Sequence, residues 1–172
     1  VGQNLGANAL QRSREVTKTG AVGTMVVLFV ASILVLGFPE AAMGLFIDDP
    51  DVIASGVTMF TIVAPFWGFF GGLMVIQGAF RGAGRTKVAF GLSMLSRWAV
   101  RIPLAVVLAF VLGWGPVGLW WGMATSAFVT FLVGGAWFAV GGWSEAVIEG
   151  AGEPATGSGQ DVGLETDPEI DD

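Results

Sequence analysis

The sequence predicts an all-α integral membrane protein, and three features carry this prediction. Hydrophobic residues make up 53% of the 172-residue chain, whereas only 13% of its residues are charged. In soluble domains about a quarter of the residues are usually charged. The mean hydropathy of the chain is +0.72. Long apolar stretches alternate with short polar segments, and none shows the period-two pattern of a barrel strand.

Each apolar stretch is long enough to cross a bilayer, because a core about 30 Å thick needs about 20 helical residues. The expected spans cover residues 20–38, 52–80, 88–112 and 117–141. The second has 29 uncharged residues, which is enough to tilt or to project from the membrane. Residues 1–143 are therefore expected to form a four-helix transmembrane unit.

Helix-starting residues stand between the expected spans. Asp49 and Pro50 fit a helix start, with Asp as the N-cap and Pro at the first helical position. Thr86 is expected to cap the third helix, and Gly115-Pro116 is expected to separate the third helix from the fourth.

Pro65 interrupts the second span, and Gly68 follows it closely. Proline removes one backbone hydrogen bond from a helix interior. The interruption is interpreted either as a hinge at Pro65 and Gly68 or as an irregularity that the membrane helix tolerates.

The charges predict an orientation, since short loops rich in Lys and Arg stay cytoplasmic. Three bases precede the first span and three follow the second: Arg12, Arg14, Lys18, Arg81, Arg85 and Lys87. The loop between those spans carries four acids and no base: Glu40, Asp48, Asp49 and Asp51. We therefore expect a multi-pass plasma-membrane protein whose N-terminal segment is cytoplasmic and whose acidic loop is outside.

The tail, residues 144–172, differs from the rest of the chain. It holds nine acids and no base, which accounts for the net charge of −6, and it has few apolar residues. This composition predicts a disordered segment. Four spans after a cytoplasmic start place this tail in the cytoplasm.

The composition excludes several kinds of chemistry. The chain has no Cys and no His, which excludes disulfides, thiol nucleophiles, His-based triads and the usual zinc or haem ligation. The apolar cores contain no carboxylate, and no nucleophile has a base at useful spacing. The chain is not expected to be an enzyme, to hold a metal or to bind nucleic acid, and its expected partner is the lipid bilayer.

The segment "QGAFRGAGRTK", residues 77–87, joins the second and third spans. It lacks the Walker pattern and G-x-G-x-x-G, so it is not read as a phosphate-binding loop. It is expected to be a cytoplasmic turn in which Gly82 or Gly84 ends a helix. Its bases would hold the turn at the anionic inner surface of the membrane.

Five segments resemble, in order and spacing, the second half of multidrug and toxic compound extrusion (MATE) transporters. They are "VGQNLGANALQRSR", "LFIDDPDVIASG", "QGAFRGAGRTK", "WAVRIPLA" and "GPVGLWWG". The resemblance covers residues 1–141. It implies that the four spans are helices nine to twelve of a twelve-helix transporter, and that the chain is a fragment of its second six-helix lobe.

The resemblance also implies a function and partners. Such transporters export organic cations and other amphipathic compounds in exchange for Na⁺ or H⁺, through a cavity between their two lobes, and the substrate of this chain is expected to be amphipathic and cationic. The first lobe would then be a partner outside this chain, and a small amphipathic substrate would be the other. Two departures stand out: Arg85 replaces the usual acid after the Gly-Ala-Gly turn, and residues 52–80 lack the coupling carboxylate of some members. The resemblance therefore implies that Na⁺ or H⁺ binds outside this chain.

Five residues are candidates for the substrate cavity or its gate. Arg97 and Arg101 stand four apart on one helix face and can bind an anionic substrate group or form a gate with a carboxylate elsewhere. The structural alternative is that Arg97 snorkels to the cytoplasmic end and Arg101 pairs structurally. Gln77 can line an exit path or fix helix packing. Phe66 and Phe70 form the best pair of a larger aromatic set for stacking on an amphipathic cation.

The resemblance marks a cytoplasmic motif as well. Its residues in this chain are Gln3, Gly6, Arg81, Gly82 and Gly84. Helix capping and turn formation are the structural alternatives for these positions.

Two other functions stay open. A lipid-linked sugar flippase of the same superfamily would be expected to have a more basic cavity, which Arg97 and Arg101 would suit. A standalone four-helix assembly subunit would dimerise through small-residue faces such as Gly118 and Gly122. Those glycines are otherwise expected to pack another helix closely.

Overall fold

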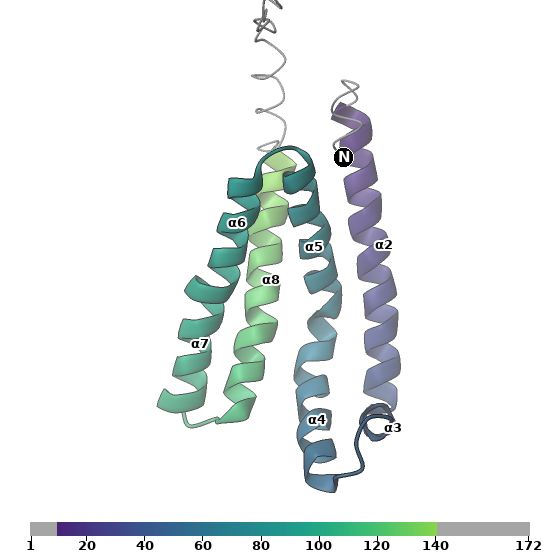
Figure 1. Ribbon diagram of the computed structural model, residues 1–172, viewed down its shortest axis with the longest axis vertical. Coiled ribbons are helices and arrows are strands. Elements are labelled where there is room, and N and C mark those ends of the chain that lie inside the picture. The colour runs from purple at the N-terminus through teal and green to yellow at the C-terminus, as the bar shows by residue number, and fades with distance from the viewer. Residues whose placement is uncertain (1–9, 141–172) are drawn as a thin grey trace, which may run out of the picture.

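The computed structural model describes residues 10–140, and within this range the chain is helical with no strand (Figure 1). The predicted all-α fold is confirmed. Gln3, Gly6 and the tail 144–172 lie outside the described residues. Four helical stretches are long and apolar enough to cross a membrane: Gln11–Gly37, Pro50–Gly82, Thr86–Val111 and Pro116–Val140.

Two of these four stretches are single helices and two are composite. The single helices are α2, Leu10–Gly37, and α8, Pro116–Val140. The second stretch consists of α4 (Pro50–Val63), the 3₁₀ turn η1 (Ala64–Phe66) and α5 (Trp67–Gly82). The third consists of α6 (Thr86–Met94), π-helical η2 (Leu95–Arg101), α7 (Ile102–Val106) and π-helical η3 (Val107–Val111). A short helix, α3 (Pro39–Gly44), joins α2 to α4.

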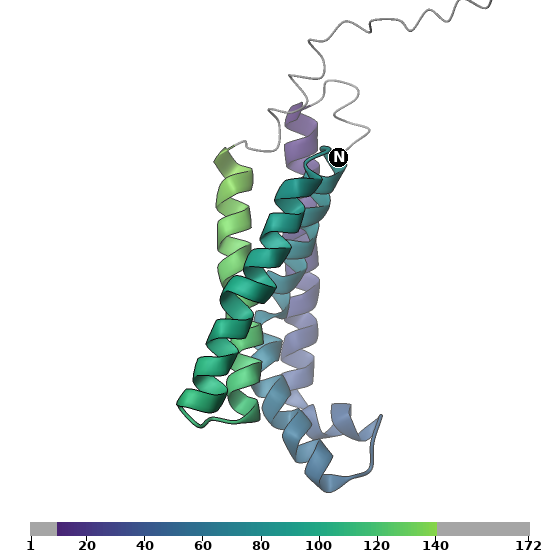
Figure 2. The same ribbon diagram turned by 60° about the vertical axis from the view of Figure 1, so that its left-hand side comes forward.

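The four spans lie side by side in the order first, second, fourth and third, and they do not close into a symmetrical bundle (Figures 1 and 2). Helix α2 packs mainly on α5, α5 packs on α8, and α8 packs on η2, α7 and η3. The turn between α5 and α6 brings these two helices together at one end, and the third span leans away from the second toward the other end (Figure 1).

The tightest apolar core lies where α5, α6 and α8 meet. Phe80 at its centre is fully buried, and its ring meets the Phe138 ring edge-on with centroids 6.2 Å apart. Around this pair lie the buried residues Ile76, Ala79, Ala83, Ala89 and Leu92. This core holds the three helices together beside the α5–α6 turn.

Small residues let neighbouring helices approach closely. A Cβ at Gly118 would lie 2.5 Å from the backbone nitrogen of Ala109, and one at Gly122 would lie 2.9 Å from the Cβ of Ala105. The expected close packing at Gly118 and Gly122 is confirmed, and the neighbour is the third span of the same chain.

The helix ends agree with the sequence at most positions. The Asp49 side chain accepts hydrogen bonds from the backbone N–H of Asp51 (2.9 Å) and Val52 (3.4 Å), so its expected role as N-cap is confirmed. The prediction for Thr86 is wrong. Thr86 is the first residue of α6. The N-cap residue of α6 is Arg85, and its side chain makes no capping hydrogen bond. Helix α8 begins at Pro116, as expected.

The α5–α6 turn is a Schellman-type helix end. Gly84 has a φ of 76°, a left-handed conformation that glycine adopts without a steric penalty. The N–H of Arg85 bonds to the carbonyl of Phe80 at 2.8 Å, and the N–H of Gly84 bonds to that of Arg81 at 3.0 Å. Gly82 is the last residue of α5, so Gly84 is the residue that reverses the chain.

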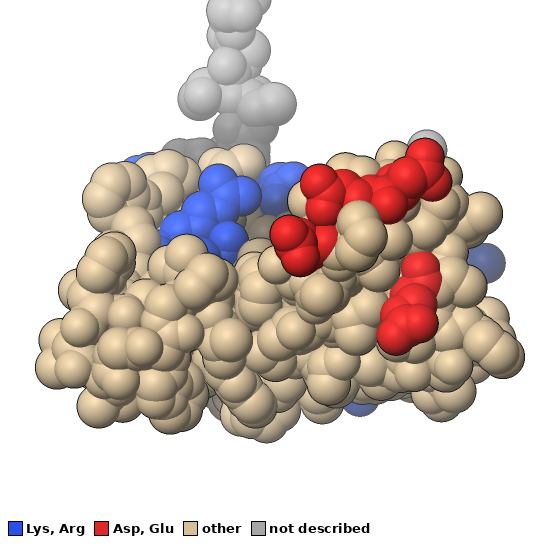
Figure 3. Space-filling view, turned by 90° about the horizontal axis from the view of Figure 1, so that it is seen from below, with Lys and Arg blue, Asp and Glu red and all other residues tan. Residues whose placement is uncertain are grey.

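Apart from Glu15 in α2 and the two arginines of η2, the basic and acidic residues of the described chain gather at opposite ends. The start of α2 and the α5–α6 turn carry Arg12, Arg14, Lys18, Arg81, Arg85 and Lys87. The opposite end carries Glu40, Asp48, Asp49 and Asp51. Figure 3 looks on this acidic end and shows acidic side chains beside a hollow in which basic atoms are visible.

Candidate functional site

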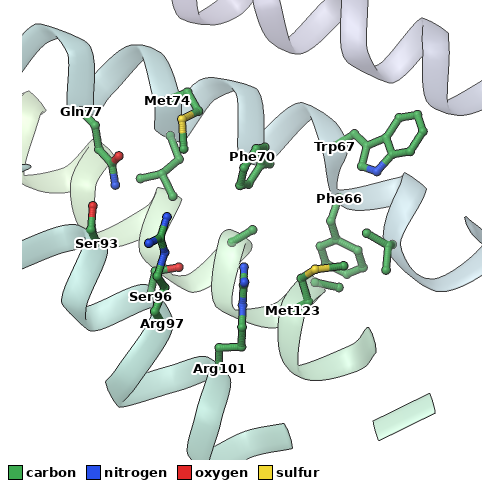
Figure 4. Close-up of a pocket in the computed structure, with 14 residues that line it drawn as sticks. Phe66, Trp67, Phe70, Met74, Gln77, Ser93, Ser96, Arg97, Arg101 and Met123 are labelled. Carbon is green, nitrogen blue, oxygen red and sulfur yellow. The ribbon is translucent and has the colours of Figure 1, made fainter. Parts of the chain in front are cut away.

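A cavity of about 290 Å³ lies between the second span, η2 and α8 (Figure 4). The bulky and polar side chains around it are Phe66, Trp67, Phe70, Met74, Gln77, Ser93, Ser96, Arg97, Arg101 and Met123. All five predicted cavity or gate residues, namely Phe66, Phe70, Gln77, Arg97 and Arg101, line this one cavity.

Helical spacing explains why these residues converge. Phe66, Phe70, Met74 and Gln77 are three or four positions apart, so they lie on one face of the second span. The third span contributes Ser93, Ser96, Arg97 and Arg101 with similar spacing, and Figure 4 shows the two arginines directed toward α5. The two faces meet across the gap that opens beyond the α5–α6 turn.

Arg101 is held by a polar group of α8. Its Nε donates to the Ser126 hydroxyl at 3.2 Å, and that hydroxyl donates to the carbonyl of Met123 at 2.8 Å. Ser126 is fully buried, so its hydroxyl has a fixed position. Ser126 is therefore a structural partner for Arg101, which is one of the two alternatives that the sequence allowed.

Arg97 differs from Arg101 in this respect. It lines the same cavity, but within residues 10–140 it makes no hydrogen bond or ion pair. Its guanidinium projects across the cavity toward α5 (Figure 4). Arg97 lies eleven residues after Thr86, or about 16 Å along the helix, which is close to the middle of a bilayer core about 30 Å thick.

Gln77 closes the cavity on the side of the basic end. It is 3% exposed, and its Oε1 accepts a hydrogen bond from Arg81 at 3.3 Å. The amide therefore serves packing as well as lining the cavity. Arg81, Gly82 and Gly84, from the expected cytoplasmic motif, belong to the adjoining turn and do not line the cavity.

The two phenylalanines have different surroundings. The Phe66 ring meets Trp121 and Phe128 of α8 at centroid distances of 6.3 Å and 6.2 Å. These edge contacts fix Phe66. Phe70 is 45% exposed and lines the cavity, so its ring has surface left for a ligand.

The interruption at Pro65 lies beside the cavity. Ala64, Pro65 and Phe66 form a 3₁₀ turn between α4 and α5, as expected for a proline that lacks a backbone donor. Gly68 follows in α5, and a Cβ there would lie 2.4 Å from the Phe29 ring of α2. The structure thus gives Gly68 a packing role, while a hinge at Pro65 and Gly68 stays a prediction.

Acidic groups are absent from the cavity wall. No Asp or Glu lines it, and residues 10–140 contain no group of His, Cys, Asp and Glu that could hold a metal ion. A cationic ligand in this cavity would need its counter-charge from groups outside the described residues.

Comparison with known proteins identifies the family of this chain. Residues 1–107 match the family MatE, which is more than half of the chain. This chain belongs to the MATE family. The probable multidrug resistance protein NorM of Pseudomonas aeruginosa is 37% identical over 130 residues, which is 72% of this chain and 26% of that protein.

Other relatives of the MATE chain give the same picture. The protein of the same description from Pseudomonas putida is 33% identical over 72% of this chain and 28% of its own length, and that from Deinococcus radiodurans is 30% identical with the same coverage. No solved structure matches the chain. According to the shares given for the two Pseudomonas proteins, the MATE chain spans about a quarter of the length of these relatives.

Sequence reasoning missed several residues of this MATE cavity. Met74, Met123, Ser93 and Ser96 line the cavity, and none of them was singled out as a candidate from the sequence. The signal in the second span was present, because Met74 follows Phe70 by four positions on the same face. No comparable signal exists for Met123, which only the packing of α8 brings to the cavity.

Proposed function

We propose that this chain forms one wall of the substrate cavity of a multidrug efflux antiporter, which exports amphipathic, cationic compounds in exchange for Na⁺ or H⁺. One observation carries the proposal: a cavity between three apolar spans combines aromatic and Met side chains with a few polar groups. Apolar walls with few polar groups are typical of small-molecule sites. Flexible Met side chains suit ligands of varied shape.

The proposal includes a partner for this wall. The chain covers about a quarter of its curated relatives, so the rest of the cavity would come from the first lobe of the transporter and the remaining helices of the second. Those parts would also supply the carboxylate that binds Na⁺ or H⁺ and balances a cationic substrate, since no acid lines the described wall.

The charge distribution supports an orientation in the plasma membrane. The basic end would face the cytoplasm and the acidic end the outside, according to the positive-inside rule. In that orientation the core around Phe80 would close the cavity toward the cytoplasm, and the cavity would lie on the outer side of this core.

A second candidate is export of a lipid-linked sugar, and one observation favours it. Both arginines of the third span line the cavity without an acidic residue beside them, as a phosphate-carrying substrate would require. The third candidate, an assembly subunit that dimerises through Gly118 and Gly122, loses its main support. Both glycines are covered by Ala105, Leu108 and Ala109 of the same chain.

Efflux from cells tests the proposal. The gene region encoding this chain, with all sequence in frame with it, would be expressed in a bacterial strain that lacks its own drug pumps. We expect reduced ethidium accumulation that is restored when the Na⁺ or the proton gradient is dissipated, and the ionophore that restores accumulation identifies the coupling ion. We expect no efflux from residues 1–172 alone. Unchanged ethidium accumulation in cells with the full-length protein would reject the proposal.

A further inference from the structure

The cavity wall has a charge that an export site for cations alone does not explain. Arg97 and Arg101 both line it, and no carboxylate does. In the described residues Arg97 is exposed and Arg101 is half-buried. Two cations four residues apart repel each other, and placing them inside a membrane without an anion is costly. A negative charge between the two guanidinium groups would relieve both costs.

The two arginines are not equivalent in their capacity for such an anion. Arg101 already donates its Nε to Ser126, which fixes the side chain but leaves its terminal NH groups for a further acceptor. Arg97 has all its donors free of partners within residues 10–140, and it points across the cavity toward α5 (Figure 4). Arg97 is thus the group with the greatest capacity to bind an incoming anion.

Apolar and polar groups surround the arginines in a way that fits one kind of ligand. Phe70 and Met74 face the arginines from the second span, and both are partly exposed, at 45% and 43%. Gln77, Ser93 and Ser96 lie near the cavity end closest to the α5–α6 turn and supply hydrogen-bonding groups (Figure 4). An aromatic or aliphatic body against Phe70 and Met74 would place its anionic end between Arg97 and Arg101.

We propose that Arg97, with Arg101 fixed beside it by Ser126, binds the anionic head group of an amphipathic substrate. The inference rests on the proposed function for the transport step, and it assigns a substrate class to the same cavity: compounds with an apolar body and a carboxylate or phosphate. Zwitterionic compounds belong to this class, because their positive end can meet a carboxylate elsewhere in the transporter. Two sources supply such an anion: a soluble aromatic carboxylate and a lipid-linked pyrophosphate.

Binding by the purified full-length transporter in lipid nanodiscs tests this. The probes are fluorescein, which carries a carboxylate, and a rhodamine ester, which has the same xanthene ring system and a positive charge. Fluorescence anisotropy gives the Kd of each dye. We expect Arg97→Gln to weaken fluorescein binding at least tenfold, which corresponds to about 1.4 kcal/mol, and to leave rhodamine-ester binding unchanged.

Two further variants make the test specific. Arg97→Lys keeps the charge but loses the planar fork of donors, so we expect an intermediate Kd for fluorescein. Lys87→Gln removes a positive charge from the exposed start of α6, outside the cavity, and should change neither Kd. A polyprenyl pyrophosphate that displaces fluorescein identifies the lipid source, and displacement only by aromatic carboxylates identifies the soluble source.

Three results would overturn the inference. The first is that the unaltered transporter does not bind fluorescein. The second is that Arg97→Gln binds fluorescein normally, because Arg97 is already paired with a carboxylate outside this chain. In the third case the variant would lose both dyes to the same extent, as expected for a structural arginine. These outcomes leave the proposed efflux untouched if ethidium is still exported. Conversely, Arg97-dependent fluorescein binding without any export would reject the transport function and keep the binding site.

Discussion

Among the glycines of residues 10–140, Gly118 is the one at which an added Cβ would come closest to the backbone of another helix. A Cβ at this position would meet the backbone nitrogen of Ala109 at 2.5 Å and the carbonyl carbon of Leu108 at 2.7 Å. Backbone atoms cannot rotate away as a side chain can. The helices would have to separate to accept any larger residue.

Gly118→Ala should therefore destabilise the protein, by about 1–3 kcal/mol as for other overpacked interiors. The measurement is the melting temperature of the detergent-solubilised protein, followed by size-exclusion chromatography of a fluorescent fusion. Gly23→Ala is the matched control, since a Cβ at Gly23 has no neighbour within 4 Å and alanine favours the helix. Equal melting temperatures for the two variants would contradict the packing argument.

Arg97 and Arg101 show at the same scale how position in the fold separates similar residues. They belong to one helical face and to one π-helical segment. Ser126 of α8 lies within hydrogen-bonding distance of Arg101, and within residues 10–140 no such partner lies beside Arg97. The different roles proposed for the two arginines come from this neighbour and not from their spacing.

Pro103 accounts for the first of the two π-helical segments of the third span. Pro103 has no N–H to donate, and its ring would clash with a carbonyl one turn earlier in a regular helix. The preceding segment Leu95–Arg101 is π-helical, and the N–H of Ile102 bonds to the carbonyl of Arg97. Such wide turns often occur at functional sites, and here the turn carries both arginines of the cavity.

The 3₁₀ turn η1 in the second span is the place where α4 and α5 could move relative to each other. Pro65→Ala restores a backbone donor within the 3₁₀ turn of Ala64–Phe66, so we expect α4 and α5 to join as a straighter and stiffer helix. Spin labels at Ser55 and Gly78, one exposed position on each helix, report this change as a longer and narrower distance distribution by electron-spin echo measurements. The unmodified residues 1–172 contain no Cys that would compete for the label.

Pro116→Ala is the control for this measurement. Pro116 starts α8 and has no place in the second span, so its replacement should leave the distribution between Ser55 and Gly78 unchanged. An unchanged distribution in Pro65→Ala itself would mean that Pro65 is a tolerated irregularity and not a hinge.

Within residues 10–140 the bases outside the cavity lie at one end, with Glu15 beside them, and the other four acids lie at the opposite end. This separation predicts the orientation of the molecule. Single Cys replacements at Asp48 and Lys87 place one thiol at each end, and both positions are exposed. In intact cells we expect a membrane-impermeant maleimide to label Asp48→Cys, and to label Lys87→Cys only after the membrane is permeabilised. Labelling of Lys87→Cys in intact cells would reverse the proposed orientation.

The shape of the molecule also explains where a cavity can form. The core around Phe80 binds α5, α6 and α8 together at the basic end, and the spans separate beyond it. The cavity is the space between the second span, η2 and α8 that remains where the spans separate. A fourth wall would come from helices of the proposed transporter that lie outside this chain.

Most of the fold and part of the candidate site could be predicted from the sequence. Apolar length predicted the four spans, since a bilayer sets the length of a crossing helix. Asp49-Pro50 predicted a helix start and Gly115-Pro116 predicted the break between the third and fourth spans, because capping and proline geometry are local properties. The cap predicted at Thr86 failed, because the reversal at Gly84 already positions the start of α6.

The sequence by itself determined which residues share a helix face, because a helix repeats every three to four residues: Phe66 with Phe70 and Gln77, and Arg97 with Arg101. Only the tertiary structure decided that these two faces meet in one cavity, that Met123 joins them, and that Ser126 holds Arg101. Those contacts depend on how separate helices pack, and no spacing within one helix specifies the side chain that another helix places against it.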